Sequence, residues 1–359
     1  MGCRRRARRR RPARPYLPVR QHRCQPRDPA RRGDTLHLPR RTCGLPRRRN
    51  THAGRPAAIT QRGLRHGSSR RVGHQPRTAG HTASGRMTVR WGILGAGWIV
   101  QTATAQALRD APSAHLAAVA ARDISRARNL MPDRAYSDYR ALIDDESIDA
   151  VYIALANDQH APWIHRAIDA GKHVLCEKPL TLSAADTQAA FDAARAAGVE
   201  LVEAAWSMWH PRMRRVTDLV SSGEMGAIRN FLGTFTFDGV PEGNYRLDPQ
   251  LGGGALLDIG IYPLHALIGC APTWTPHDIE KNAIDGGLGV DMTTKARVTT
   301  ETGSCASIIA SFSMPESQRL SIEADGGTIR ITDDQAFTTW RQPTSLQIND
   351  HVENFPETD

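Results

Sequence analysis

A lysine flanked by an acid and a proline, Glu177-Lys178-Pro179, is the first group suited to proton chemistry. It follows the short apolar run 173–176, which is predicted to be a parallel strand. Ligands of open α/β sheets bind where such strands end. A lysine there can donate a hydrogen bond to a substrate hydroxyl, and its charge lowers the pKa of that hydroxyl. Most isolated lysines are solvated surface residues, so the chemistry depends on the pattern around this one.

A second group lies on a helix-like run over 255–269, after Gly252-Gly253-Gly254. Asp258 and Tyr262 are four positions apart, so on a helix they face the same side, together with His265. Three polar groups on an apolar helix predict a site. The alternative is a buried tyrosine whose hydroxyl is satisfied locally.

A glycine-rich turn, Gly95-Ala96-Gly97, predicts where a nucleotide would bind. It lies between an apolar strand pattern and a helix-like segment, within RWGILGAGWIV at 90–100. The first glycine permits a tight turn, the second lets backbone approach a pyrophosphate, and the helix N-terminus at Trp98 and Ile99 offers free N–H groups. Val100 replaces the third small residue of the pattern, which should alter helix–strand packing rather than pyrophosphate binding. A glycine turn in an ordinary α/β protein is the alternative.

Arg122 predicts which dinucleotide binds. It follows the second strand, expected at 116–121, where NAD-binding proteins carry an acid that accepts from the ribose 2′-OH. A guanidinium can instead pair with the 2′-phosphate of NADP and stack on adenine. We therefore predict NADP, while the neighbouring Asp123 leaves NAD open. A solvated surface role for Arg122 is the alternative.

The elements that must position these residues alternate between strand and helix patterns up to Trp206. This predicts a doubly wound parallel sheet of Rossmann type over 87–206. From 207 to 359 a different texture predicts an α+β domain with an open, mainly antiparallel sheet. The expected strands are 90–94, 116–121, 150–156, 173–176, 199–204, 228–237, 294–300, 304–313, 318–325, 328–332 and 335–341. The expected helices are 98–110, 160–170, 184–197, 212–222 and 255–269.

The first 86 residues differ from the rest in charge. They hold 25 arginines, two aspartates and no lysine or glutamate, so they carry +23 while the remainder carries −13 of the net +10. A segment with so little apolar periodicity cannot offset its ordering entropy, and we predict disorder. A nucleic-acid-binding arm fits the charge. A twin-arginine export signal needs an apolar run that is missing. We favour a third interpretation, in which the segment is not native and translation begins at Met87.

Composition excludes several other classes. We find no run approaching 18 apolar residues, which argues against a membrane span. The six cysteines show no metal-binding spacing, so we expect no metal site and reduced thiols in the cytoplasm.

The chain resembles the Gfo/Idh/MocA oxidoreductase family over about 88–340. The matching motifs are GILGAGWI, the AxxxGKHVLCEKPL block from Ala167, VEAAW with His-Pro at 210–211, and GGGALLDIGIYPLH at 252–265. Within the family it looks most like the dimeric dihydrodiol dehydrogenases and NADP-dependent D-xylose 1-dehydrogenases. The resemblance implies hydride transfer between a sugar or vicinal-diol hydroxyl and NADP, or NAD.

The resemblance also implies catalytic roles. Lys178 matches the family's EKP lysine near the nicotinamide, and Tyr262 matches the tyrosine that serves as acid and base. Asp258 would then position substrate or Tyr262.

Other implied residues line the pocket. Asn157 and His160 match residues that line the nicotinamide or substrate pocket, Glu177 is expected to bind the cofactor, and Trp206 falls at the domain junction beside the pocket. One departure is Met208, where many members carry arginine before the His-Pro pair.

The C-terminus at Asp359 looks truncated relative to the family. We therefore expect reduced stability or weakened dimerisation, since the family often pairs through its open sheet; a homodimer or higher oligomer is expected if that sheet is complete. Two functions outside catalysis stay open: a dinucleotide-binding sensor or inactive remnant of the family, and nucleic-acid binding through the arginine-rich segment.

Overall fold

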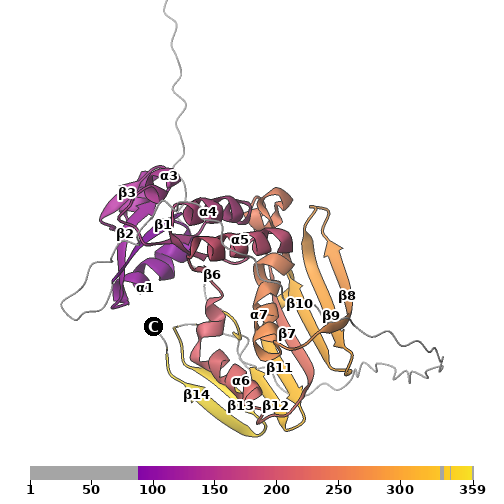
Figure 1. The fold of residues 1–359 in the computed structure, drawn as a ribbon. Helices are drawn as coiled ribbons and strands as arrows, with labels where there is room; N and C mark the ends of the chain where they lie inside the picture. Colours follow the sequence, from indigo (N-terminus) through magenta and orange to yellow (C-terminus); the bar gives the residue numbers. More distant parts are fainter. Residues whose placement is uncertain (1–87, 332–334, 340, 358–359) are drawn as a thin grey trace, which may run out of the picture. The chain divides into compact units, whose positions relative to one another are not determined.

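The structure is a computed structural model that describes residues 88–331, 335–339 and 341–357 (Figure 1). The predictions for residues 1–86 and for a start at Met87 lie outside the described residues. All described residues belong to one compact unit of the chain.

The first sheet is the predicted doubly wound parallel sheet. Its six strands run in the order β3-β2-β1-β4-β5-β6, and every pair is parallel. The order reverses at β1, so the crevice between the ends of β1 and β4 is the position where such sheets bind ligands. The strands are β1 Val89–Leu94, β2 Ala114–Ala120, β3 Arg134–Tyr136, β4 Ala150–Ile153, β5 His173–Cys176 and β6 Leu201–Glu203.

The helices of this domain connect successive strands, as a parallel sheet requires. They are α1 Ala105–Asp110, α2 Ile124–Arg128, α3 Tyr139–Ile143, α4 Asn157–Asp169 and α5 Ala184–Ala197. Helix α5 has the predicted bounds because its ends are chemically marked. The Ser183 side chain accepts a hydrogen bond from the Asp186 amide, and Gly198 ends the helix with φ +70°.

The helix after the glycine turn begins with a wider turn than expected. A π-helical turn, η1 Val100–Thr104, precedes α1. Val100, which stands where the pattern has a small residue, is completely buried in a cluster with Ile93 and Tyr152. The sequence predicts altered packing between helix and strand at Val100. In the structure the wider π turn accommodates the larger valine side chain there.

The second sheet has eight strands in the order β14-β13-β12-β11-β7-β10-β9-β8. It is mainly antiparallel, but β7 and β10 pair in parallel. The strands are β7 Ile228–Asp238, β8 Pro276–Asp285, β9 Asp291–Thr300, β10 Cys305–Ser311, β11 Ser313–Ala324, β12 Gly327–Ile331, β13 Thr344–Ile348 and β14 His351–Phe355.

Helical segments pack against this sheet, with the long helices visible beside it in Figure 1. They are η2 Trp206–Trp209, α6 Pro211–Ser221, η3 Tyr245–Leu247, η4 Pro249–Leu251, η5 Leu256–Gly260 and α7 Ile261–Cys270. Their apolar faces meet the strands in a core that includes Val216, Ala266 and Phe231.

Some sequence expectations for this domain were wrong. The described residues within 335–341 form turns, not the expected strand. Strand β8 was missed because all ten of its residues are exposed, so it carries no alternation of buried and exposed side chains. Strands β3, β13 and β14 were also missed, since each is only three to five residues long.

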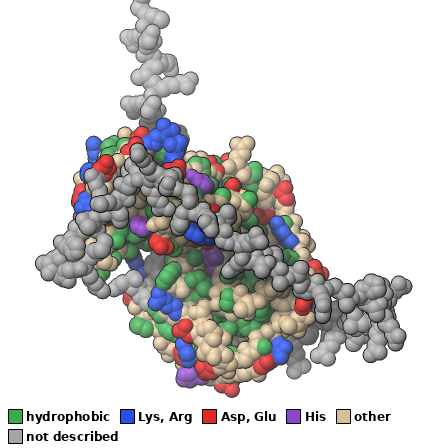
Figure 2. Space-filling model, viewed as in Figure 1, with side chains coloured by type: hydrophobic (Ala, Val, Ile, Leu, Met, Phe, Trp, Pro, Cys, Tyr) green, Lys and Arg blue, Asp and Glu red, His purple; other side chains and the backbone are tan. Residues whose placement is uncertain are grey.

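One apolar stretch qualifies the prediction about membranes. The helical run Pro249–Cys270 is long and apolar enough to span a membrane by length and composition alone. However, 56% of its apolar window is buried inside the protein, and residues from it belong to the core of the second domain. This is the pattern of a core helix. On the face seen in Figure 2, charged side chains of both signs are interspersed over the described residues.

Candidate functional site

The glycine turn after β1 leaves room on one side only. Gly95 has φ +101°, and a Cβ placed on it would lie 2.3 Å from the Ala154 carbonyl oxygen. A Cβ on Gly97 would meet no atom within 4 Å. The first glycine is therefore required by the fold, while the second faces open space at the start of a helix. This geometry fits a pyrophosphate, which needs close backbone approach and helix N–H groups.

The carbonyl of Ala96 anchors the turn. It accepts hydrogen bonds from Gln101 Nε2 at 2.8 Å and from Arg126 at 2.5 Å. Trp98 is 68% exposed, and Ile99 lines a cavity of about 330 Å³ together with Glu177 and Trp206. Three predicted residues from distant segments thus border one hollow.

Arg122 is placed at the end of β2 as the sequence predicts. It is exposed and makes no hydrogen bond or ion pair with any described residue. Asp123, in contrast, caps α2 by accepting from the Ser125 amide and hydroxyl. Its carboxylate is therefore already engaged, whereas the guanidinium of Arg122 is available to a ligand. The nearby Arg126 was not singled out from the sequence, because nothing in its spacing indicates contact with the glycine turn.

Lys178 and Asp258 meet at the centre of the candidate site. The Lys178 Nζ donates to the Asp258 carbonyl at 2.9 Å and to its Oδ1 at 3.0 Å. A residue missed by the sequence analysis completes the cluster, since Arg246 Nε lies 2.5 Å from Asp258 Oδ2. The Asp258 side chain is only 5% exposed. A buried carboxylate thus bridges two cations, Lys178 from the first domain and Arg246 from the second.

The cluster shifts the pKa values of its members. Burial would raise the pKa of Asp258, but Lys178 and Arg246 outweigh burial and hold it below its ordinary 3.8. Burial would likewise lower the pKa of Lys178, yet Asp258 and the neighbouring Tyr262 raise it above 10.5. Both groups are therefore ionised near neutral pH.

Tyr262 lies beside this cluster in an aromatic setting. The Lys178 Nζ is 5.4 Å from its ring centroid, and the Trp206 ring meets it edge-on at 6.4 Å. Burial raises the pKa of Tyr262 above 10.0, while Lys178 and a hydrogen bond with Trp206 act in the opposite direction. The hydroxyl is therefore protonated near neutral pH and has a cation close by. The predicted face shared by Asp258 and Tyr262 thus meets Lys178, although a π turn, η5, precedes α7 there.

Two residues that the sequence places in the pocket, His160 and Asn157, contact backbone carbonyls in this structure. His160 is completely buried, and its Nδ1 and Nε2 lie 2.8 Å and 3.2 Å from the carbonyls of Pro179 and Leu155. Asn157 Nδ2 donates to the Gly252 carbonyl at 2.9 Å. In this structure both side chains support the turns that carry Lys178 and the glycine run, because both ring nitrogens of His160 and the amide nitrogen of Asn157 contact backbone carbonyls.

Glu177 connects the turn to the sheet. Its Oε1 accepts a hydrogen bond from the Tyr152 hydroxyl, and its Oε2 accepts from the Lys178 amide at 3.3 Å. On the other side, Glu203 accepts from the Leu180 amide at 2.7 Å and lies 2.9 Å from His265 Nε2. The lysine is therefore presented by a turn held on both sides. His265 contacts Glu203 rather than the cluster.

The loop that carries Arg246 packs directly against the glycine run at 252–254. The Gly254 amide donates to the Arg246 carbonyl at 2.9 Å, and a Cβ on Gly253 would lie 2.5 Å from that same oxygen. The sequence signal that could have identified Arg246 is its position shortly before three consecutive glycines.

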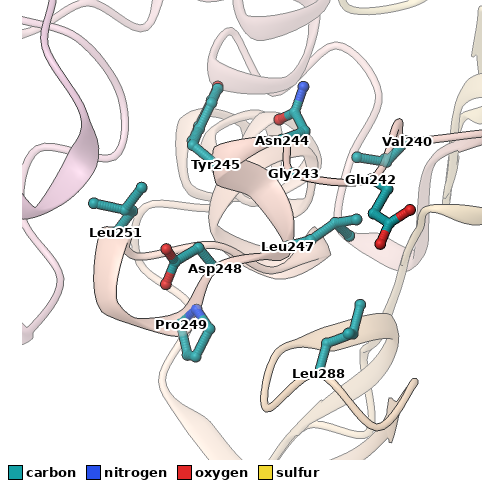
Figure 3. Close-up of a pocket in the computed structure, with 10 residues that line it drawn as sticks. All are labelled: Val240, Glu242, Gly243, Asn244, Tyr245, Leu247, Asp248, Pro249, Leu251 and Leu288. Atoms are coloured by element: carbon teal, nitrogen blue, oxygen red, sulfur yellow. The ribbon is translucent and has the colours of Figure 1, made fainter.

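The same loop lines a cavity of about 580 Å³ (Figure 3). Leu288 closes it from the hairpin between β8 and β9. The acids Glu242 and Asp248 border the cavity, and no lysine or arginine of the described chain does. Tyr245 lines this cavity and also contacts the cluster, since the Arg246 guanidinium lies 4.8 Å from its ring centroid. Burial and the charge of Asp258 raise the pKa of Tyr245.

The described residues offer no cluster of side chains suited to bind a metal ion. The residues at 88–331, 335–339 and 341–357 contain no set of three or more His, Cys, Asp or Glu that could hold an ion.

Comparison with protein families matches both parts of the chain. Residues 89–204 match "Oxidoreductase family, NAD-binding Rossmann fold", and residues 213–330 match "GFO/IDH/MocA C-terminal domain".

Individual relatives act on sugars and diols. The chain is 33% identical to dTDP-3,4-didehydro-2,6-dideoxy-alpha-D-glucose 3-reductase of Actinomadura kijaniata, over 74% of this chain and 82% of that protein. It is 37% identical to D-xylose 1-dehydrogenase (NADP(+)) 2 of Haloferax volcanii, over 67% and 74%. It is 32% identical to trans-1,2-dihydrobenzene-1,2-diol dehydrogenase of Mus musculus, over 75% and 80%.

A solved structure shares the fold. KijD10, a 3-ketoreductase from Actinomadura kijaniata in complex with NADP and TDP-benzene, superimposes with a TM-score of 0.65 at 30% identity. The match covers 76% of this chain and 85% of that chain.

Proposed function

This chain belongs to the Gfo/Idh/MocA family of oxidoreductases, and from that premise we propose that it transfers a hydride between a sugar or diol hydroxyl and NADP, using Tyr262 and Lys178. The family and the NADP-dependent relatives make it an NAD(P)-dependent oxidoreductase. The assignment of roles to residues is the proposal.

The observation that carries the proposal is the cluster of Lys178, Asp258 and Tyr262 beside the end of β5. In the reducing direction, the protonated Tyr262 donates its proton to the carbonyl oxygen that becomes a hydroxyl. In the oxidising direction, Tyr262 accepts the hydroxyl proton, and the charge of Lys178 stabilises the phenolate. The nicotinamide supplies the hydride chemistry, and the protein supplies position and proton transfer.

A pattern in a relative supports these two residues. KijD10 has been solved with one lysine replaced and with one tyrosine replaced, each in complex with TDP-benzene and NADP. That lysine and tyrosine are separated by the same number of positions as Lys178 and Tyr262 here.

The cofactor contacts follow from the turn and the end of β2. We propose that the backbone at Gly95, Ala96 and Gly97, continuing into Trp98 and Ile99, holds the pyrophosphate. Arg122, which is exposed and unengaged, takes the 2′-phosphate of NADP. Glu177, Asn157 and His160 act by holding the turns around the nicotinamide.

The cavity beside Tyr245 favours an uncharged substrate. Its described lining residues include two acids and no lysine or arginine, which opposes a diphosphate, since binding sites usually meet diphosphates with arginine or lysine. We therefore propose a free sugar or diol, with Trp206, Asp258 and Tyr262 contacting the reacting end. Homodimerisation and a cytoplasmic location remain predictions.

The test replaces Lys178 with alanine and with methionine. Turnover with NADP should fall by about 10²–10⁴-fold, the usual contribution of a positioned acid–base group. NADPH affinity, followed by fluorescence, should change little because Arg246 still balances Asp258. Lys295→Ala, an exposed lysine of β9, is the control.

The substrate screen should include free sugars, diols and a dTDP-sugar, each with NADP and NAD. Unchanged turnover in Lys178→Ala would refute the catalytic role. NADPH binding without turnover of any substrate would favour a sensor instead.

A further inference from the structure

We propose that Arg246 is a positioning residue for this reaction: it fixes the second oxygen of Asp258, so that Asp258 holds Lys178 in place while leaving one lysine N–H for the substrate. The proposal rests on the proposed function. It concerns a residue that comes from the loop before the glycine run rather than from either predicted catalytic motif.

The carboxylate geometry supports this division. Arg246 Nε lies against Oδ2, while Lys178 Nζ lies against Oδ1, so each oxygen serves a different cation. Lys178 uses one further N–H on the Asp258 carbonyl. An ammonium has three N–H groups, and in the described part of the chain the third has no acceptor. Without Arg246, the carboxylate would be free to rotate and offer both oxygens to the lysine.

Arg246 is held from several directions. Its amide donates to Asn244 Oδ1 at 3.0 Å, its carbonyl accepts from the Gly254 amide, and its guanidinium lies 4.8 Å from the Tyr245 ring centroid. Its side chain is 31% exposed, compared with 13% for Lys178. The guanidinium is thus a preorganised partner whose planar fork suits a carboxylate.

The charge balance gives the proposal a measurable consequence. The titratable groups that face Asp258 are Lys178, Arg246, Tyr262 and Tyr245, and those that face Tyr262 are Lys178, Arg246, Glu177 and Asp258. With Arg246 present, two cations surround one buried carboxylate. Its removal leaves Lys178 neutralised by Asp258, so the pKa of Tyr262 should rise further.

The kinetic experiment compares Arg246→Met and Arg246→Lys with the wild type. Arg246→Met should lower kcat by about 10²-fold, the usual scale for a misplaced catalytic group, with a smaller change in KM. The alkaline rise of kcat for alcohol oxidation should move to higher pH. Arg246→Lys should restore the pH profile and part of kcat. Arg215→Met is the matched control, because it breaks the partly buried Arg215–Glu353 pair in the same domain.

A second measurement does not depend on turnover. A lowered pKa of Asp258 contributes stability that is present above its unfolded pKa and lost as pH falls through the folded pKa. Arg246→Met should therefore move the acid loss of thermal stability to higher pH. In an Asp258→Asn background, the same change should leave the acid limb unmoved.

These readings separate the possible outcomes. A rise in KM with unchanged kcat and pH profile would make Arg246 a substrate contact and overturn the proposal. An equal shift of the acid limb by Arg246→Met in the wild type and in the Asp258→Asn background would overturn it as well. If the wild type shows no turnover, the proposed function fails, and the stability cycle still decides whether Arg246 acts through Asp258.

Discussion

Two glycine-rich turns in this protein look alike in sequence and do opposite things. At Gly95–Gly97 the second glycine faces open space, and no atom lies within 4 Å of where its Cβ would be. At Gly252–Gly254 all three positions are filled by neighbouring protein: a Cβ would meet Leu182, the Arg246 carbonyl and Asp291, respectively. The first turn leaves room for a ligand, and the second allows two segments of the chain to touch.

The comparison shows that a glycine run does not by itself indicate a phosphate site. What distinguishes the two is whether the space that glycine leaves is occupied by protein. The second run places Arg246 beside Asp258, so it contributes to the site through packing. Substitutions at the two turns should therefore separate stability from cofactor binding.

The largest effect on stability is expected for Gly254→Ala. Its φ is +114°, and the added Cβ would lie 2.2 Å from Asp291 Oδ1, whose carboxylate also accepts from the Leu256 amide. The strained backbone alone costs about 1–3 kcal/mol, and the displaced carboxylate adds to this. The midpoint of thermal unfolding should fall clearly. Gly171→Ala is the control, because its φ is +70° but nothing lies within 4 Å of the new Cβ. Equal losses in the two variants would contradict the packing role.

A second effect should appear in cofactor binding alone. Gly97→Asp places a side chain and a negative charge in the open space, so we expect about 100-fold weaker NADPH binding, or about 2.7 kcal/mol. Because no protein atom is displaced, the unfolding midpoint without cofactor should stay at the wild-type value. Loss of stability without cofactor would show that this turn is packed like the other one. The stabilisation that NADPH gives the wild type should be lost in parallel.

The smallest effect concerns which cofactor the open turn receives. Arg122→Gln should weaken the binding of NADP about tenfold, or about 1.4 kcal/mol, and leave the affinity for NAD unchanged, since only NADP has the 2′-phosphate. Kinetic constants with both cofactors measure this. Arg128→Gln, an exposed arginine on helix α2, which follows Arg122, is the control. A parallel loss for NAD would place Arg122 on the shared part of the dinucleotide.

The sequence predicts elements well where chemistry marks their ends. Helix α5 and strand β5 have the predicted bounds, because Ser183, Gly198 and buried alternation specify them. The shared helix face of Asp258 and Tyr262 was predicted from their spacing, but the bond between Lys178 and Asp258 was not, because nothing in the sequence pattern places that strand end against that helix. Strand β8 was not, because both of its faces are exposed and β-pairing alone defines it.

Contacts between segments far apart in sequence were the hardest to foresee. Arg246 reaches Asp258 only through the packing of a loop whose own pattern is polar and irregular. The supporting roles of His160 and Asn157 depend on which carbonyls the fold brings near them. No periodicity encodes such partners.

The pairing of Lys178 with Asp258 has a consequence for protein engineering. The two residues are 80 positions apart in the sequence. The hydrogen bond that positions Lys178 for catalysis therefore also links residues 87–206 to residues 207–359. A substitution at Lys178 or Asp258 should therefore change thermal stability and turnover together. Directed evolution for higher thermal stability should keep Lys178 and Asp258 and place stabilising substitutions elsewhere, for example along the fully exposed strand β8.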